Sequence, residues 1–309
     1  MMSNELSTLD ELTRFKEETW VNGTHAELPL KKVLFAVRNR VGAVVCGESG
    51  VGKSAVAQQI FQKMSTSMDE TQSYYPVVYA PLEPKTQVKG LLIDLLEQMG
   101  MENIDRLTEK QLRKMLYKQI RACEVRLIIL DEFQHLLRQH NASLNSDVCD
   151  FIKVLMNQTG VSVALFGMEE GARLLDLNGQ MKTRFSQPVI MRRMSLDADG
   201  EPRYFQWFVS ELLKQYPRKT KGIDTWDAAL RLLMACEGNL RELKKILGAM
   251  MVNSAPDPKR SLTLKDAEVA YLEVNHDKVF RGVNGRQIFP FRSDINIVHG
   301  YLKHASGIK

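Results

Sequence analysis

Few cysteines and no long apolar stretch occur in this chain of 309 residues. The cysteines lie far apart and form no C-x-x-C pair, which favours reduced thiols over disulfides or zinc ligands. No apolar run approaches the roughly 20 residues that a membrane-spanning helix needs. The N-terminus, MMSNELSTLDELTRFKEE, is acidic and lacks the apolar segment of a signal peptide. We therefore expect a cytoplasmic protein with no membrane partner.

The chain also lacks internal repeats, low-complexity tracts and an extreme of charge. Hydrophobic residues make up 44% and charged residues 26%, as in ordinary globular proteins. The net charge of +5 permits contact with nucleic acid but does not demand it. The length exceeds the usual size of one domain, so we expect a large core with a smaller appendage.

A glycine-rich motif follows the apolar run VGAVVC. The stretch GESGVGKSAVAQQIF contains G-x-x-x-x-G-K-[ST] between a strand-like and a helix-like segment, which is the context that this motif requires. Glycines let such a loop turn its N–H groups inward, and the following helix directs its dipole at the same anion. Lys53 would contact the β- and γ-phosphates, and Ser54 would bind Mg²⁺. The ATP site predicted here comprises Gly47, Glu48, Ser49, Gly50, Val51, Gly52, Lys53, Ser54 and Ala55.

Two acidic residues end a second apolar run. The segment RLIILDEF, residues 126–133, predicts a buried parallel strand with carboxylates at its C-terminal edge. Asp131 would hold the Mg²⁺ shell there, and Glu132 would activate the attacking water. A strand end with solvated acids is the alternative. The pair favours ATP hydrolysis over nucleotide binding alone.

Strand-like and helix-like segments alternate as far as residue 194, which predicts a doubly wound α/β fold with a parallel sheet. Later segments indicate helices only, with Asp197, Thr225 and Thr263 as N-caps. The predicted domains are an N-terminal arm (1–35), an α/β core (36–194), an all-helical lid (195–275) and a C-terminal tail (276–309). Predicted strands span 42–46, 76–80, 127–130, 161–167 and 187–191, and predicted helices span 53–64, 88–100, 108–122, 143–158 and 169–175.

This layout resembles the AAA+ class of P-loop ATPases. In QMKTRFSQPVI, Arg184 and Phe185 resemble the dipeptide whose arginine reaches a neighbouring subunit's γ-phosphate. In EGNLRELKKIL, Arg241 resembles the lid arginine that senses the same phosphate. An ordinary surface arginine is the alternative for Arg184, and a helix-face partner of Glu237 or Glu242 is the alternative for Arg241. Met168 stands where the class carries a polar first sensor, which implies slow hydrolysis unless Glu169 substitutes.

Within that class, the order of segments resembles the TnsC/TniB family of transposition regulators over about residues 25–270. The matching pieces include GESGVGKS, YYPVVYAPLEPKT, VSVALFGMEEGARLL, MKTRF and GNLRELKKIL. The resemblance implies ATP- and Mg²⁺-dependent assembly into a homo-oligomer, a ring or a filament, on duplex DNA. It further implies a link between a TniQ-like target selector and a TnsB- or TniA-like DDE transposase, with ATPase activity stimulated by DNA.

Basic residues offer an independent indication of DNA. In TEKQLRKMLYKQIRACE they recur along one face of a predicted helix, while Leu112, Leu116 and Ile120 form an apolar stripe on another. A solvated helix face is the alternative. Such contacts would hold the phosphate backbone without reading bases. The predicted DNA-binding residues are Lys110, Arg113, Lys114, Lys118 and Arg121 on the helix, with Lys85, Thr86 and Lys89 in EPKTQVKG.

The two ends of the chain allow more than one interpretation. HAELPLKKVLFAVRN is expected to frame the adenine, with Pro29 starting its turn. The tail is either a mobile arm with apolar anchors for a partner or a segment packed on its own domain. A replication initiator or loader of the AAA+ class, and a P-loop signalling scaffold without DNA, are the alternatives to the transposition regulator. The tail of about 30 residues is too short for an initiator's winged-helix domain.

Overall fold

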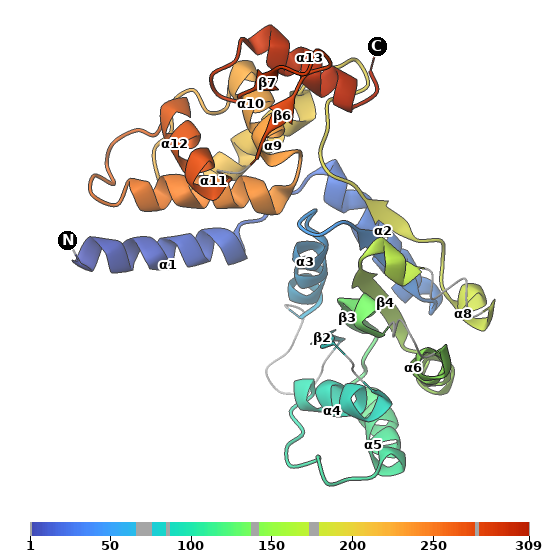
Figure 1. The fold of residues 1–309 in the computed structure, drawn as a ribbon. Coiled ribbons are helices and arrows are strands. Elements are labelled where there is room, and N and C mark those ends of the chain that lie inside the picture. The colour runs from blue at the N-terminus through green and yellow to red at the C-terminus, as the bar shows by residue number, and fades with distance from the viewer. Residues whose placement is uncertain are drawn as a thin grey trace. The chain divides into compact units, whose positions relative to one another are not determined.

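A computed structural model describes residues 2–65, 76–84, 87–136, 142–172, 179–275 and 278–308. The chain divides into two compact units, shown in Figure 1. We call residues 24–192 the sheet unit, and residues 1–23 with 193–309 the helical unit. This division differs from the predicted segments, because it splits the predicted N-terminal arm between the units and joins the predicted tail to the helical unit.

The sheet unit contains a five-stranded parallel sheet in the order β2-β3-β4-β1-β5. Its central strands β1, β3 and β4 are buried along their whole length, as expected of parallel strands covered on both faces. The predicted doubly wound sheet is confirmed. The strands are β1 (Ala43–Gly47), β2 (Val77–Pro81), β3 (Leu127–Asp131), β4 (Ser162–Gly167) and β5 (Val189–Met191).

Helices surround this sheet, and their apolar faces supply its core. On α5, the predicted stripe of Leu112, Leu116 and Ile120 is buried against the sheet cluster. A capping box begins α5, in which the Gln111 carboxamide oxygen accepts the Thr108 N–H at 2.9 Å. The helices are α2 (Thr24–Asn39), α3 (Lys53–Ser65), α4 (Val88–Gln98), α5 (Glu109–Ala122), η1 (Phe133–Leu136, a 3₁₀ turn), α6 (Ala142–Thr159) and α8 (Gly179–Arg184).

The helical unit has its own apolar core, built from distant parts of the sequence. The N-terminal helix α1 lies along α11 in Figure 1, and Phe15 of α1 is buried in that core. Arg218 joins α1 through its hydrogen bonds to Glu11 and Thr8. The helices are α1 (Met2–Glu18), α9 (Arg203–Lys214), α10 (Trp226–Cys236), α11 (Leu240–Asn253), α12 (Leu264–Val274) and α13 (Ile295–Ala305).

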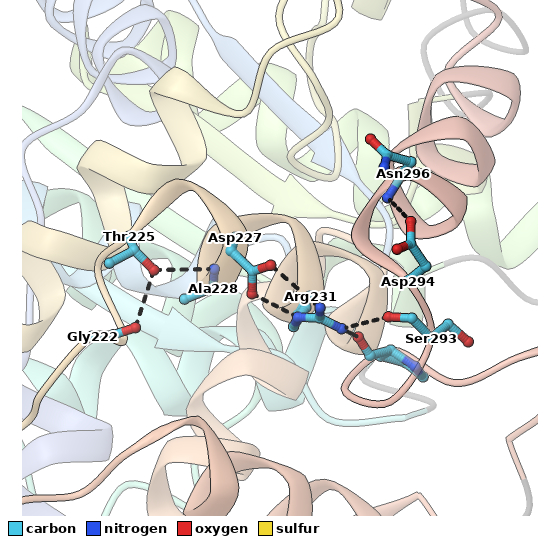
Figure 2. A network of polar contacts seen from close by, with 9 residues as sticks. Gly222, Thr225, Asp227, Ala228, Arg231, Ser293, Asp294 and Asn296 are labelled. Carbon is cyan, nitrogen blue, oxygen red and sulfur yellow. Dashed lines mark hydrogen bonds and ion pairs between the residues drawn. The ribbon is translucent and has the colours of Figure 1, made fainter.

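The C-terminal segment packs on its own unit, which decides between the two expectations for the tail. It forms a short antiparallel hairpin, β6 (Phe280–Arg281) with β7 (Gln287–Ile288), and then α13. The expectation of helices only after residue 195 is therefore wrong. Figure 2 shows the attachment: Arg231 of α10 donates to the carbonyl oxygens of Pro290 and Ser293 at 2.9 and 3.0 Å, while Asp227 holds its guanidinium.

The local expectations have different outcomes. Thr225 caps α10, because its hydroxyl accepts the Ala228 N–H at 3.3 Å (Figure 2), and Thr263 begins α12 in a capping box. Asp197 is not an N-cap: its carbonyl oxygen accepts the Gly200 N–H in a turn, and α9 begins only at Arg203. Pro29 lies inside α2 and starts no turn. The predicted helix at 169–175 is described for residues 169–172.

Candidate nucleotide-binding and hydrolysis site

The glycine-rich loop connects the end of β1 to the start of α3. Gly50 and Gly52 have φ values of 83° and 101°, which side chains with a Cβ rarely adopt. A Cβ on Gly47 would lie 2.3 Å from the Met191 carbonyl oxygen, so the neighbouring strand β5 also requires glycine there. The loop therefore has the tight curl that the motif predicts, directly before a helix N-terminus.

Lys53 is buried and lies within the curl of this loop. Its ammonium donates to the carbonyl oxygens of Gly47 and Glu48 at 2.9 and 2.7 Å. These bonds partly neutralise a charge that would otherwise be costly to bury. Beneath the loop, burial and the charge of Glu169 raise the pKa of Cys46 to about 12, so this thiol stays neutral at physiological pH.

The acidic pair lies at the carboxyl end of β3. Asp131 is buried and accepts two hydrogen bonds, from the Tyr79 hydroxyl at 2.8 Å and from the Glu132 N–H at 2.9 Å. Burial, and then the adjacent Asp131 charge, raise the pKa of Tyr79, which keeps this hydroxyl a proton donor. Glu132 has a φ of 57°, an uncommon conformation for a residue other than glycine.

Ser54 and Asp131 form the predicted metal pair. Ser54 lies in the first turn of α3, which contacts β3, and Asp131 ends that strand. A hydroxyl and a carboxylate are hard oxygen ligands of the kind that Mg²⁺ prefers, and Mg²⁺ commonly takes its other ligands from water and phosphate. The donor set therefore fits Mg²⁺. Among the described residues, no group of three or more His, Cys, Asp or Glu side chains forms a further metal site.

The turn after β3 connects Glu132 to two other strand ends. The Gln134 side-chain amide donates to the Glu132 carboxylate, and its carbonyl oxygen accepts the Met168 N–H at 2.9 Å. The His135 ring nitrogen Nδ1 lies 2.7 Å from the Leu82 carbonyl oxygen. Leu82 in turn donates its N–H to the Asp131 carbonyl oxygen at 2.9 Å. The ends of β2, β3 and β4 are thus joined around Glu132.

Arg184 lies near the amino end of β1, whereas the glycine-rich loop lies at its carboxyl end. Its carbonyl oxygen accepts the Gly42 N–H at 2.8 Å, just before β1, whereas the loop follows the other end of β1 at Gly47. Five residues of strand span roughly 17 Å. The side chain of Arg184 is exposed, while Phe185 is buried against Gly42, where a Cβ would lie 2.3 Å from its ring. Phe185 thus fixes the backbone from which Arg184 projects.

Arg241 lies in the first turn of α11 in the helical unit. The Asn239 carboxamide oxygen caps this helix by accepting the N–H groups of Arg241 and Glu242 at 3.0 and 3.3 Å. Glu237 forms ion pairs with Arg193 and Lys278, at 3.3 and 3.1 Å. The phosphate-sensing role of Arg241 stays a prediction.

The predicted basic residues do not form one uniform group. Lys110, Lys114 and Lys118 are exposed along α5, and within the described part of the chain they make no hydrogen bond or ion pair. Arg113 differs, because it pairs with Glu109 at 2.7 Å and lies over the Phe151 ring at 4.7 Å. The other predicted DNA-binding residues are Arg121, which donates to the Gln158 carbonyl oxygen at 2.7 Å, Lys89, which donates to that of Asp105 at 2.9 Å, and Lys85 and Thr86, which lie outside the described residues.

Comparison with known proteins identifies the family. A model of the bacterial TniB protein matches residues 14–194, more than half of the chain. The chain belongs to the TniB family. The match includes the whole sheet unit, with the glycine-rich loop, the acidic pair and Arg184, and ends before Arg241. A comparison with curated protein sequences finds no match.

Solved structures with a similar fold cover most of the chain, including residues beyond the family match. The Aeropyrum pernix ORC2 protein, in its ADPNP–ADP complexes, is similar with a TM-score of 0.61 at 13% identity over 86% of this chain and 72% of that one. Cdc6p from Pyrobaculum aerophilum has a TM-score of 0.57 at 11% identity, over 91% of this chain and 95% of that one. A Walker-type ATPase of Pyrococcus abyssi has a TM-score of 0.54 at 12% identity, over 80% of this chain and 71% of that one. The resemblance to the AAA+ class is confirmed, and this TniB-family protein is an ATPase.

Sequence reasoning missed three members of the site in this TniB-family chain. Tyr79 contacts Asp131 across adjacent strands, and its signal was only a hydroxyl in the strand predicted beside β3. Gln134 and His135 lie in a short turn without hydrophobic periodicity. Their contacts to Met168 and Leu82 join segments 34 and 53 residues apart, which no local pattern predicts. In the described residues, no helix has the length and apolar character to cross a membrane.

Proposed function

We propose that this protein is an ATP-dependent, DNA-binding regulator of transposition. In this proposal it assembles as a homo-oligomer, a ring or a filament, on duplex DNA. The assembly links a TniQ-like target selector to a TnsB- or TniA-like transposase. Membership of the TniB family supports the connection to transposition, and the AAA+ fold supports the use of ATP.

In this proposal, each residue of the nucleotide site has a role. The loop from Gly47 to Ala55 binds the triphosphate through its N–H groups, and Lys53 turns from the loop carbonyls toward the phosphates. Ser54 and Asp131 hold Mg²⁺, which supplies positive charge to the phosphates when bound. Glu132 accepts the proton of the attacking water, and general bases of this kind contribute roughly 10²- to 10⁴-fold to a rate.

Arg184 supports a site shared between subunits. Its backbone lies roughly 17 Å of strand away from the loop of its own chain, which is farther than an arginine side chain extends. A guanidinium exposed on a rigid anchor can contact the phosphate of a neighbouring copy instead. Assembly would then complete the site for hydrolysis.

The observation that carries the DNA proposal is the row of Lys110, Lys114 and Lys118. These ammonium groups have no partner among the described residues, and they lie at intervals of four residues on one face of α5. A rigid row of this kind suits the phosphates of a duplex, whose contact releases counterions. The segment that leads from β2 toward Lys89 is also tied to Asp131 through Leu82, which supports coupling between DNA and the ATP site.

A charge-reversal experiment tests this proposal. We expect the K110E/K114E/K118E variant, assayed with ATP and duplex DNA, to lose affinity and to show a shallower dependence of log K on log salt, by up to about 2.7. The matched control reverses three exposed lysines of the helical unit, K219E/K259E/K265E. Equal affinity and slope in the two variants would show that the α5 row does not bind DNA. No binding of duplex DNA by the parent protein with ATP would favour the ATP-gated scaffold without DNA.

A further inference from the structure

We propose that Gln134 positions Glu132 for hydrolysis and couples it to the end of β4. Its carboxamide lies between two groups that differ in hydrogen-bonding character. The Glu132 carboxylate only accepts, and the Met168 N–H only donates. The amide satisfies both in a single orientation, because the reverse orientation would direct its NH₂ at the N–H and its oxygen at the carboxylate. This inference depends on the proposed role of Glu132 as the base.

Two glycines leave space for the turn that carries Gln134. A Cβ on Gly167 would lie 2.4 Å from the side-chain oxygen Oε1 of Gln134 and 2.6 Å from the Phe133 ring. A Cβ on Gly171 would lie 2.6 Å from the same ring, which is fully buried. These two glycines, at the end of β4 and in the helical turn after it, let the turn that carries Gln134 approach the backbone of Met168.

The backbone of Glu132 is fixed independently of Gln134. Its N–H donates to the Asp131 carboxylate at 2.9 Å, and its carbonyl oxygen accepts the His135 N–H at 2.9 Å. These bonds do not fix the side chain, which has three rotatable torsions. Gln134 binds one carboxylate oxygen and leaves the other for water. A base needs this constraint, because a displacement of about 1 Å can cost roughly 100-fold in rate.

This arrangement explains how the site works with Met168 at the position of the expected polar sensor. The methionine side chain makes no strong hydrogen bond, but its backbone N–H holds Gln134. A movement of the carboxyl end of β4 would therefore be transmitted to the Glu132 side chain through its hydrogen bond with Gln134. Glu169, the substitute suggested by the sequence, is not required for that connection.

The test replaces Gln134 with methionine, which has a similar shape but lacks both the carbonyl oxygen and the NH₂ group of the amide. With full-length protein, ATP, Mg²⁺ and duplex DNA, we expect Q134M to lower kcat roughly 10- to 100-fold, with nucleotide affinity within about twofold of the parent. The control is Q98M, at an exposed glutamine of α4, which should change neither value. In an E132Q background, Q134M should cause no further loss, because the side chain that it positions has already lost its function.

The outcomes separate this inference from the role of Glu132. If E132Q keeps full turnover, Glu132 is not the base and both proposals fail. If E132Q is inactive but Q134M hydrolyses ATP at the parental rate, only the role of Gln134 is wrong. A parallel loss of nucleotide affinity or melting temperature in Q134M would show that Gln134 merely supports the fold, and would also overturn the inference.

Discussion

Polar side chains that are buried or partly buried occur in both units, but they have different partners. In the sheet unit, Lys53 contacts carbonyl oxygens of the glycine-rich loop, Asp131 contacts the Tyr79 hydroxyl, and Gln134 contacts the Glu132 carboxylate. In the helical unit, Arg218 and Arg231 connect elements distant in sequence: Arg218 holds α1, and Arg231 holds the C-terminal segment. The first set can exchange its partners for a ligand, whereas the second set has partners that belong to the fold.

The comparison indicates that burial alone does not identify a functional residue. Arg218, which is 7% exposed, is about as buried as Lys53 at 6%, and a search for buried charges would select both. The difference lies in the backbone around them. Lys53 lies beside glycines with positive φ and a helix N-terminus, which are the elements of the proposed phosphate site, whereas Arg218 contacts ordinary helices.

The largest effect should come from Lys53. We expect K53A to lower ATP affinity at least about 100-fold, since a hydrogen bond to a charged group contributes up to about 3 kcal/mol. The free energy of unfolding without nucleotide should change by no more than about 1 kcal/mol, because the ammonium contacts carbonyls of its own loop. Calorimetric titration and urea unfolding measure the two quantities. Unfolding of the sheet unit in K53A would place Lys53 with the structural set.

Local sequence patterns predicted the parts of the fold that depend on local chemistry. The apolar runs that form the strands at 43–47, 127–131 and 162–167 were predictable as buried strands. The glycines between Gly47 and Ser54 were predictable as the loop. Thr225 and Thr263 were predictable as N-caps because a cap requires only the next turn. The position of the sheet edge that carries the site followed from the parallel order of strands.

Contacts between distant segments decided the rest. The sequence predicted no helix in the C-terminal segment, so α13 was missed, and the path of this segment depends on Arg231, about 60 residues earlier. Gln134 has no pattern of its own, and its role depends on the space left by Gly167. Asp197 is a residue type common at N-caps, but its backbone forms hydrogen bonds with Gly200 and Glu201 in a turn, and no helix begins there.

A smaller effect, on stability alone, should come from Arg218. We expect R218M to destabilise the helical unit by about 2 kcal/mol, below the range for fully buried pairs because Glu11 is partly exposed. ATP affinity should not change. Tryptophan fluorescence reports this unit selectively, because Trp20, Trp207 and Trp226 all lie in it. The control is R203M, which breaks the exposed pair with Asp199 and should leave the stability of this unit nearly unchanged. Equal losses in the two variants would contradict a structural role for burial at Arg218.

The smallest effect should be a dependence on pH in the sheet unit. Burial lowers the pKa of His25, at the start of α2, from 6.5 to about 4. The folded state therefore keeps His25 neutral while the unfolded state binds a proton below pH 6.5, so stability falls as pH drops from 6.5 toward 4 and is unaffected above that window.

Because His25 is partly exposed, we expect a loss of only about 1 kcal/mol at pH 5 relative to pH 7. H25Q should remove that part of the pH dependence, while H304Q, at an exposed histidine of α13, should not. Hydrogen exchange of the β1 amides, which α2 contacts, measures the difference. If H25Q and the parent lose protection equally between pH 7 and pH 5, His25 is not the group responsible. The acid sensitivity of the sheet unit would then belong to its carboxylates.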